Sequence, residues 1–173
     1  RAGVPIIGVE PSCIACFRDE YPDLIRGPEA REVAAQSFFI EEFISGLADR
    51  GELNLDFAAP GGRTRILLHT HCYQKAFGTA ESVVKMLRLL PNAQVEEISA
   101  GCCGMAGSFG YEKEHYDISM AIGEQILFPA VRKAETDTII AAAGTSCRAQ
   151  IKDGTQRKAC HPVSVLAQAL TSR

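Results

Sequence analysis

Four of the seven cysteines in this chain of 173 residues have a spacing that suits a metal centre. Twenty-nine residues separate the first from an adjacent pair, and forty-three residues separate that pair from the last. The four are Cys72, Cys102, Cys103 and Cys147. Thiolates bind Zn²⁺ and iron–sulfur clusters. Adjacent cysteines converge poorly on one small ion, but they can bind different irons of a cluster, so the spacing favours an iron–sulfur cluster.

Three other interpretations of these cysteines stay open. They could be buried free thiols, because cysteine is among the most buried residue types. Cys102 and Cys103 could form a vicinal disulfide, although such a bond closes a strained ring. Four thiolates could also hold a zinc ion, although structural zinc sites usually take their ligands from closely spaced pairs.

The cysteines follow segments that have the pattern of β-strands. Apolar, β-branched runs predict strands over residues 4–9, 66–68, 95–99 and 137–143. Helical spacing predicts helices over residues 29–47, 79–91 and 112–134, with Thr79 as a cap, Pro129 as a kink or break, and Pro162 opening a closing helix.

Strands that alternate with helices predict an α/β fold, in which helices flank a parallel sheet in Rossmann-like layers. The C-terminal edge of such a sheet is where ligands gather. We therefore expect the cysteines to meet at this edge.

Composition narrows the class of protein. Hydrophobic residues make up 46% and charged residues 23%, as is typical of a globular chain. The net charge is −3 without a block of basic residues, which argues against nucleic acid as a partner. An odd number of cysteines and no signal peptide favour a reducing compartment. We expect a cytoplasmic protein that partners could hold at the inner face of a membrane.

An internal repeat is visible at an offset of 134 residues. Residues 6–13 (IIGVEPSC) resemble residues 140–147 (IAAAGTSC), and a basic–acidic pair follows each cysteine. A unit that ends near Cys147 begins near Arg63, so the equivalent first unit would begin before Arg1. We therefore expect the tail of a first repeat, with a helix and a connection, over residues 1–62. A complete second repeat should cover residues 63–173, in one compact unit cut from a longer protein.

The segment GCCGMAGSFG at residues 101–110 resembles the signature of the cysteine-rich CCG domain. That domain occurs in heterodisulfide reductase and in the iron–sulfur subunits of glycolate oxidase and anaerobic glycerol-3-phosphate dehydrogenase. It also forms the C-terminal part of large FAD-linked oxidases that act on D-lactate and related 2-hydroxy acids. The segments EPSC with FRDE, HCYQK and GTSC are most similar to this last group; they begin at residues 10, 17, 71 and 144.

The resemblance implies an electron-transfer part of an oxidoreductase that acts on 2-hydroxy acids such as D-lactate or glycolate. Its partners would be FAD on another domain or subunit, a further CCG repeat upstream and an electron acceptor. The fragment alone would lack activity. Two alternatives are a catalytic CCG site that reduces thiols or disulfides, as in heterodisulfide reductase, and a structural zinc domain.

The resemblance also implies the ligands. Cys72, Cys102, Cys103 and Cys147 match family cysteines that hold a 4Fe–4S assembly. Gly144 stands where the family has a fifth cysteine. Cys13 could supply that fifth ligand, or it could be left over from a site in the first repeat.

Four further residues have both a structural and a functional interpretation. Cys16 forms a Cys-x-x-Cys spacing with Cys13, which occurs in redox and metal sites. His71 could donate a hydrogen bond to a cluster sulfur, whereas His69 and Cys160 are better explained as structural residues. No flavin or nicotinamide fingerprint is present.

Overall fold

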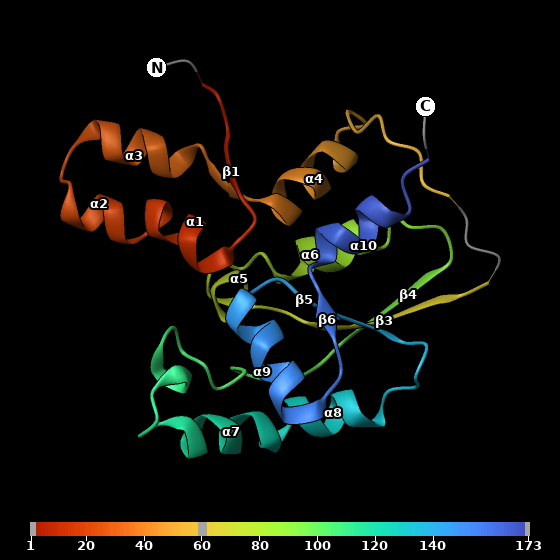
Figure 1. The fold of residues 1–173 in the computed structure, drawn as a ribbon. Coiled ribbons are helices and arrows are strands. Elements are labelled where there is room, and N and C mark those ends of the chain that lie inside the picture. The colour runs from red at the N-terminus through yellow and green to blue at the C-terminus, as the bar shows by residue number, and fades with distance from the viewer. Residues whose placement is uncertain (1–2, 59–61, 172–173) are drawn as a thin grey trace.

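Four parallel strands form the main sheet in the computed structural model, which describes residues 3–58 and 62–171 (Figure 1). Their spatial order is β4 (Ala93–Glu97), β3 (Thr64–His69), β5 (Ile139–Ala142) and β6 (Ala159–Cys160). In the register, Leu67 of β3 lies between Glu96 of β4 and Ile140 of β5. The chain therefore has the α/β fold with a parallel sheet that the sequence predicts.

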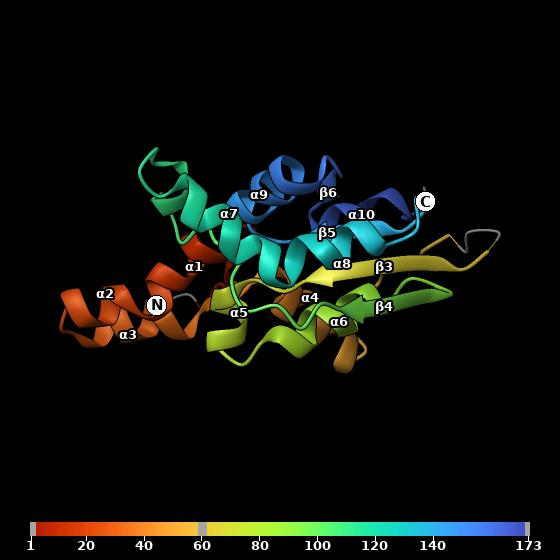
Figure 2. The same ribbon diagram turned by 90° about the horizontal axis from the view of Figure 1, so that it is seen from below.

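Helices cover both faces of this sheet, as the alternation of side chains along a strand requires. Leu67 points to one face, where it packs with α8 (Leu127–Lys133) and α9 (Thr145–Thr155). Ile66 and Leu68 point to the other face, against α6 (Ala80–Leu87) and α10 (Pro162–Gln168). Figure 2 shows α8 and α6 on opposite sides of β3.

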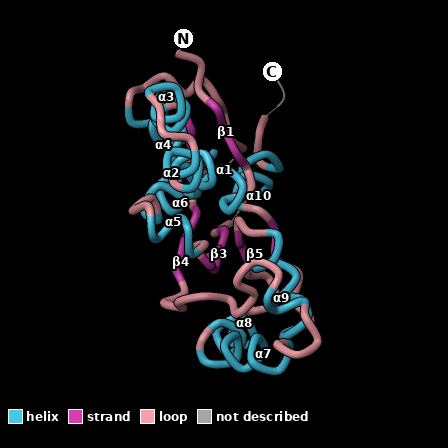
Figure 3. Tube along the Cα trace, turned by 90° about the vertical axis from the view of Figure 1, so that its left-hand side faces the viewer, coloured by secondary structure: helices cyan, strands magenta, loops and turns pink. Residues whose placement is uncertain are grey.

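A second, two-stranded parallel sheet lies in the N-terminal part. It pairs β1 (Ile6–Gly8) with β2 (Ser37–Phe39), and α4 (Ile40–Asp49) follows β2. Three helices connect the two strands: α1 (Pro11–Arg18), α2 (Glu20–Leu24) and α3 (Pro28–Ala35). Figure 3 shows α1 to α3 at the end of the molecule opposite α7 (Tyr116–Gln125).

The predicted helix over residues 29–47 is wrong, because β2 interrupts it. Ile6, Ile7 and Gly8 pair with Ser37, Phe38 and Phe39. The apolar stretch in the middle of the predicted helix thus includes Phe38 and Phe39, which belong to β2. Long-range pairing with β1 overrides the local helical pattern here.

Two helix boundaries also differ from the prediction. The long helix over residues 112–134 breaks at Ile126, between α7 and α8, and not at Pro129. A proline lacks an N–H and clashes with the carbonyl four residues earlier, so the break falls before it. Thr79 precedes α6, but its hydroxyl donates to the carbonyl of Gln74 instead of capping α6.

The remaining predicted elements are present with shifted ends, for example at β1, β4 and α6, and α10 begins at Pro162 as expected. The sequence did not predict α1, α2, α5 (Cys72–Ala76), α9 or β6. The glycine-rich loop at residues 101–110 leads into one short 3-10 helix, η1 (Phe109–Tyr111).

Candidate metal centre

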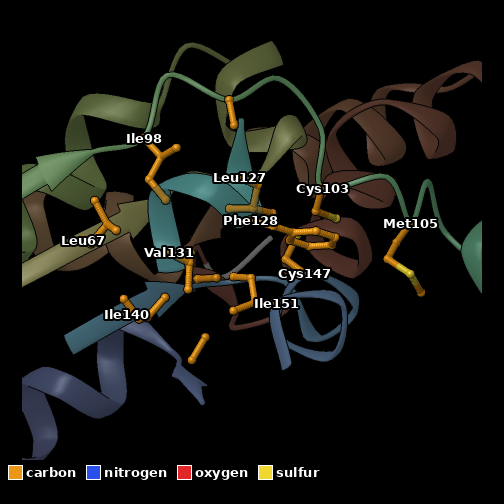
Figure 4. Close-up of a cluster of buried hydrophobic side chains, with 13 residues drawn as sticks. Leu67, Ile98, Cys103, Met105, Leu127, Phe128, Val131, Ile140, Cys147 and Ile151 are labelled. Atoms are coloured by element: carbon orange, nitrogen blue, oxygen red, sulfur yellow. The ribbon is translucent and has the colours of Figure 1, made fainter. Parts of the chain in front are cut away.

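The four cysteines gather where the three longer strands of the main sheet end. Cys72 opens α5 just after β3, Cys102 and Cys103 lie in the loop after β4, and Cys147 lies in the first turn of α9 after β5. Exposure decreases across the group: Cys72 is exposed, Cys102 is half-buried, and Cys103 and Cys147 are buried. Figure 4 shows Cys103 and Cys147 beside Phe128 in the core.

The four thiols form a continuous chain of contacts. Cys72 interacts with Cys102, Cys102 with Cys103, and Cys103 with Cys147. Ligand atoms of Cys103, Cys147 and His69 all lie within 4.8 Å of one another. The structure thus brings together the four cysteines that the spacing predicts to meet.

Hydrogen bonding along this chain separates the thiols into two kinds. Bonds from Cys103 and Cys72 hold the pKa of Cys102 far below its usual range, and the bond from Cys103, with smaller contributions from His69 and His71, lowers the pKa of Cys147 to about 3. Bonds to Cys102 raise the pKa of Cys72 and of Cys103. The lowered pKa values favour the thiolate form at Cys102 and Cys147, and a metal that displaces the remaining thiol protons would find four sulfur donors.

Two imidazoles, His69 at the end of β3 and His71 at the start of α5, contribute to the low pKa of Cys147. Both interact with its sulfur and oppose the effect of burial, which raises the pKa. His69 is 1% exposed and its Nδ1 has no hydrogen-bond partner, so one nitrogen of this buried ring remains available.

The glycine-rich loop approaches Cys102 through its backbone. The N–H of Gly104 donates to Cys102 Sγ at 3.3 Å. Gly104 has φ of +101°, and a Cβ there would lie 2.2 Å from the carbonyl oxygen of Ser119. Only glycine fits both the left-handed backbone and the close approach, so the loop holds its N–H toward the sulfur.

Charged side chains fix the loops that carry the cysteines. Lys75 donates to the carbonyl of Ala100, just before the adjacent cysteine pair. Arg148 donates to the carbonyls of Ala142 and Ala143 at the end of β5. Each bond ties a cysteine-bearing helix to a neighbouring strand end or loop.

Gly144, the residue at the position of the family's fifth cysteine, has no space for a side chain. A Cβ there would lie 2.5 Å from Cδ2 of His71 and 3.0 Å from Cys147 Sγ. The donor set therefore fits a group bound by four thiolates, and a fifth thiolate from this position does not fit the present arrangement.

The other predicted cysteines lie on α1 and β6. Cys13 is exposed and interacts electrostatically with Cys16. Burial raises the pKa of Cys16, with smaller contributions from Glu20 and Cys13. Cys160 lies in β6 and donates to the carbonyl of Ile140, in line with a structural role.

A buried carboxylate behind the site was missed by the sequence analysis. Glu41 is 1% exposed, and its Oε2 accepts from Gln74 Nε2 at 3.0 Å. Gln74 Oε1 accepts in turn from the backbone N–H of His71 at 3.2 Å. Burial raises the pKa of Glu41 to about 7. Its place on a helix with other acidic residues resembled a solvated face, so no local signal marked it.

A cleft of about 840 Å³ lies at the opposite, N-terminal edge of the main sheet. Arg65, Arg88 and Lys133 contribute to its lining, and no cysteine of the described residues does. The cysteine cluster and this cleft are therefore separate features.

In comparison with known proteins, the chain is similar to segments of dehydrogenases. No family model matches it, and no solved structure matches it. It is 28% identical to a subunit of the anaerobic glycerol-3-phosphate dehydrogenase of Escherichia coli, over 97% of this chain and 41% of that protein. It is also similar to D-2-hydroxyglutarate dehydrogenases, with 28% identity in E. coli and 30% in Pseudomonas putida.

The chain spans less than half the length of these relatives. Its similarity covers 98% of this chain but 16% of the E. coli D-2-hydroxyglutarate dehydrogenase, and 96% of this chain but 15% of the P. putida protein. Within the described part of the chain, no helix combines the length and the apolar character that crossing a membrane requires.

Proposed function

We propose that this chain is an iron–sulfur electron-transfer part of a flavin-linked dehydrogenase that acts on a 2-hydroxy acid or a related hydroxylated substrate. The contact chain of four thiols at the strand ends is the observation that carries the proposal. The similarity to segments of larger dehydrogenases supports it. In this arrangement a flavin on another domain or subunit oxidises the substrate, and an electron acceptor receives the electrons.

In the proposed site, Cys72, Cys102, Cys103 and Cys147 hold the cluster, which we assign as 4Fe–4S. Such a cluster supplies a one-electron carrier whose potential depends on hydrogen bonds to its sulfurs and on burial. The N–H of Gly104 donates to one of these cysteines, and both histidines interact with another. The chain's own residues therefore bind the iron, shield it from water on the inner side and adjust its potential.

We further propose that residues 1–62 are the tail of a first CCG repeat and that residues 63–173 are a complete second repeat. Two local arrangements support this division. The β1–α1 and β5–α9 units each place a cysteine in the first turn of the helix, and each first strand pairs in parallel with a second strand. Helices α1 and α9 start at Pro11 and Thr145, which keep the 134-residue offset.

A zinc site is the second candidate, and one observation favours it. Ligand atoms of His69, Cys103 and Cys147 already lie within 4.8 Å of one another, and imidazole and thiolate both suit Zn²⁺. The exposure of Cys72 favours a third possibility, a cluster that meets a thiol or disulfide substrate directly. Seven free cysteines suit a reducing compartment in each case.

Metal analysis of anaerobically prepared protein tests the proposal. We expect iron and acid-labile sulfide in equal amounts, a brown colour and an EPR signal after reduction. Cys103→Ser and Cys147→Ser should each lower iron affinity more than about tenfold, since loss of even an indirect contact to a metal costs this much. Cys160→Ser is the matched control and should keep its iron. A colourless protein that binds zinc with a normal fold would overturn the assignment.

A further inference from the structure

The imidazole of His71 fills the space beside Gly144. A Cβ built on Gly144 would lie 2.5 Å from Cδ2 and 2.9 Å from Nε2 of that ring. The same point is 3.0 Å from Cys147 Sγ. The ring therefore stands where a side chain at position 144 would have to pass to reach the metal centre.

Several contacts fix this ring, so it cannot simply rotate away. Its Nδ1 accepts a hydrogen bond from the backbone N–H of Tyr73 at 3.2 Å. The ring also stacks on the Tyr73 ring, with a distance of 5.8 Å between the ring centroids and an interplanar angle of 13°. The backbone N–H of His71 donates to Gln74, and Glu41 holds Gln74 from behind. His71 itself is 5% exposed.

The bond from Tyr73 also decides what Nε2 can do. Because Nδ1 accepts a hydrogen bond, the proton of the neutral ring is on Nε2. Nε2 can then donate to a sulfur but has no lone pair for a metal. His71 is consequently suited to a hydrogen-bond donor beside Cys147 and not to a ligand.

We propose that His71 occupies the space that a fifth thiolate from position 144 would need and donates its Nε2–H to Cys147, where it would adjust the potential of a bound cluster, with Gly144 as the residue that makes room for the ring. The iron–sulfur part of this inference rests on the proposed function, whereas the steric part concerns the chain without metal. Exchange of a thiolate for a neutral donor makes the site less negative, which raises the reduction potential of the cluster. His71 is thus a positioning residue that sets the potential.

A double-mutant cycle on the metal-free chain tests the steric part. Gly144 has φ of −70° and ψ of 134°, which alanine adopts readily, so Gly144→Ala measures crowding and not backbone strain. We expect it to lower the melting temperature by roughly 5 °C. In the His71→Ala background the same change should cost less than half as much. Gly101→Ala, with no atom within 4 Å of the added Cβ, is the control for a glycine of the same rim. Equal cost of Gly144→Ala in both backgrounds would overturn the steric claim.

Redox titration of the iron-loaded protein, followed by EPR, tests the electronic part. His71→Ala should shift the reduction potential to a more negative value, and His71→Gln, which keeps an N–H donor, should recover part of the shift. Gly144→Cys should change the EPR spectrum only together with His71→Ala, when a fifth thiolate has space. An unchanged potential in His71→Ala contradicts the donor role. If the wild-type protein binds no iron, the proposed function fails. The double-mutant cycle with Gly144→Ala and His71→Ala would still decide whether the His71 ring fills the space beside Gly144.

Discussion

The carboxylate of Glu10 accepts two hydrogen bonds from Thr145, 135 residues later in the chain. The backbone N–H of Thr145 donates at 2.9 Å and its hydroxyl at 2.7 Å, both to Oε2 of Glu10. Thr145 begins α9, the helix that carries Cys147. A residue between β1 and α1 therefore supplies the N-terminal cap of the helix that holds a proposed ligand, and it joins the two parts of the chain at the metal centre.

Removal of this cap should destabilise the fold. We expect Glu10→Ala to lower the free energy of unfolding by about 1 kcal/mol, the usual cost of a lost helix cap. Urea denaturation measures the change. Glu52→Ala is a suitable control, because Glu52 pairs with exposed Arg50 and such surface pairs contribute about 0–1 kcal/mol. A similar loss in both variants would show that the cap contributes no more than a surface ion pair.

The role of Cys13 can be decided by a single substitution. We expect Cys13→Ser to keep the iron content and EPR signal of the wild type, because Cys13 is exposed and interacts electrostatically with Cys16. Cys103→Ser provides the comparison that should lose iron. If Cys13→Ser lost iron to the same extent, Cys13 would be a fifth ligand, and the site would extend to α1.

Gly104→Ala should disrupt the loop that carries the adjacent cysteines. The new Cβ would lie 2.2 Å from the carbonyl oxygen of Ser119, at φ of +101°. We expect a loss of more than about 2 kcal/mol of stability from the combination of backbone strain and overpacking. Calorimetry measures it, with Gly101→Ala as a neighbouring control whose Cβ meets no atom within 4 Å. Equal melting temperatures would show that the loop relaxes freely.

Because the Glu41 carboxyl is buried, we expect the stability of the fold to decrease as the pH rises. Burial raises its pKa from 4.5 to about 7, so the folded chain holds this proton more tightly than the unfolded chain does. The stabilisation is complete below pH 4.5 and is lost as the pH rises to about 7, by about 3 kcal/mol for this carboxyl alone. Glu41→Gln, which stays neutral and can still accept from Gln74, should remove this slope.

Urea denaturation at pH 5 and pH 8 measures that slope. Glu41→Gln should be more stable than the wild type at pH 8 and close to it at pH 5. Glu81→Gln is the control, because the Glu81 side chain is 81% exposed. The groups that act on Glu41 are Gln74, His161 and His71, with Glu10 as a like charge that raises its pKa. Parallel pH profiles for wild type and Glu41→Gln would show that Glu41 is charged in the folded state.

The sequence patterns identified the elements whose structure depends on residues that are close in sequence. The apolar runs of β3 and β5 were recognisable because buried parallel strands are continuously apolar, and their ends predicted where Cys72 and Cys147 would meet. The strand β2 was not recognisable, since Ser37–Phe39 becomes a strand only by pairing with β1. The contact of His71 with the space at Gly144 was equally hidden. From sequence Gly144 was only a missing cysteine, and no pattern shows which ring fills the space that a glycine leaves.

The exposure and the lowered pKa of Cys102 should determine how air damages the metal-free protein. Cys102 is half-exposed and its lowered pKa favours the thiolate, so we expect peroxide to attack it first and form a sulfenic acid. The exposed thiol that interacts with it is Cys72, which would displace the hydroxyl as water and leave a Cys72–Cys102 disulfide. That bond would fasten the loop after β4 to the start of α5, while Cys103 and Cys147 remain protected in the core. A thiol reductant reverses it, so aged protein should regain its capacity for metal after reduction.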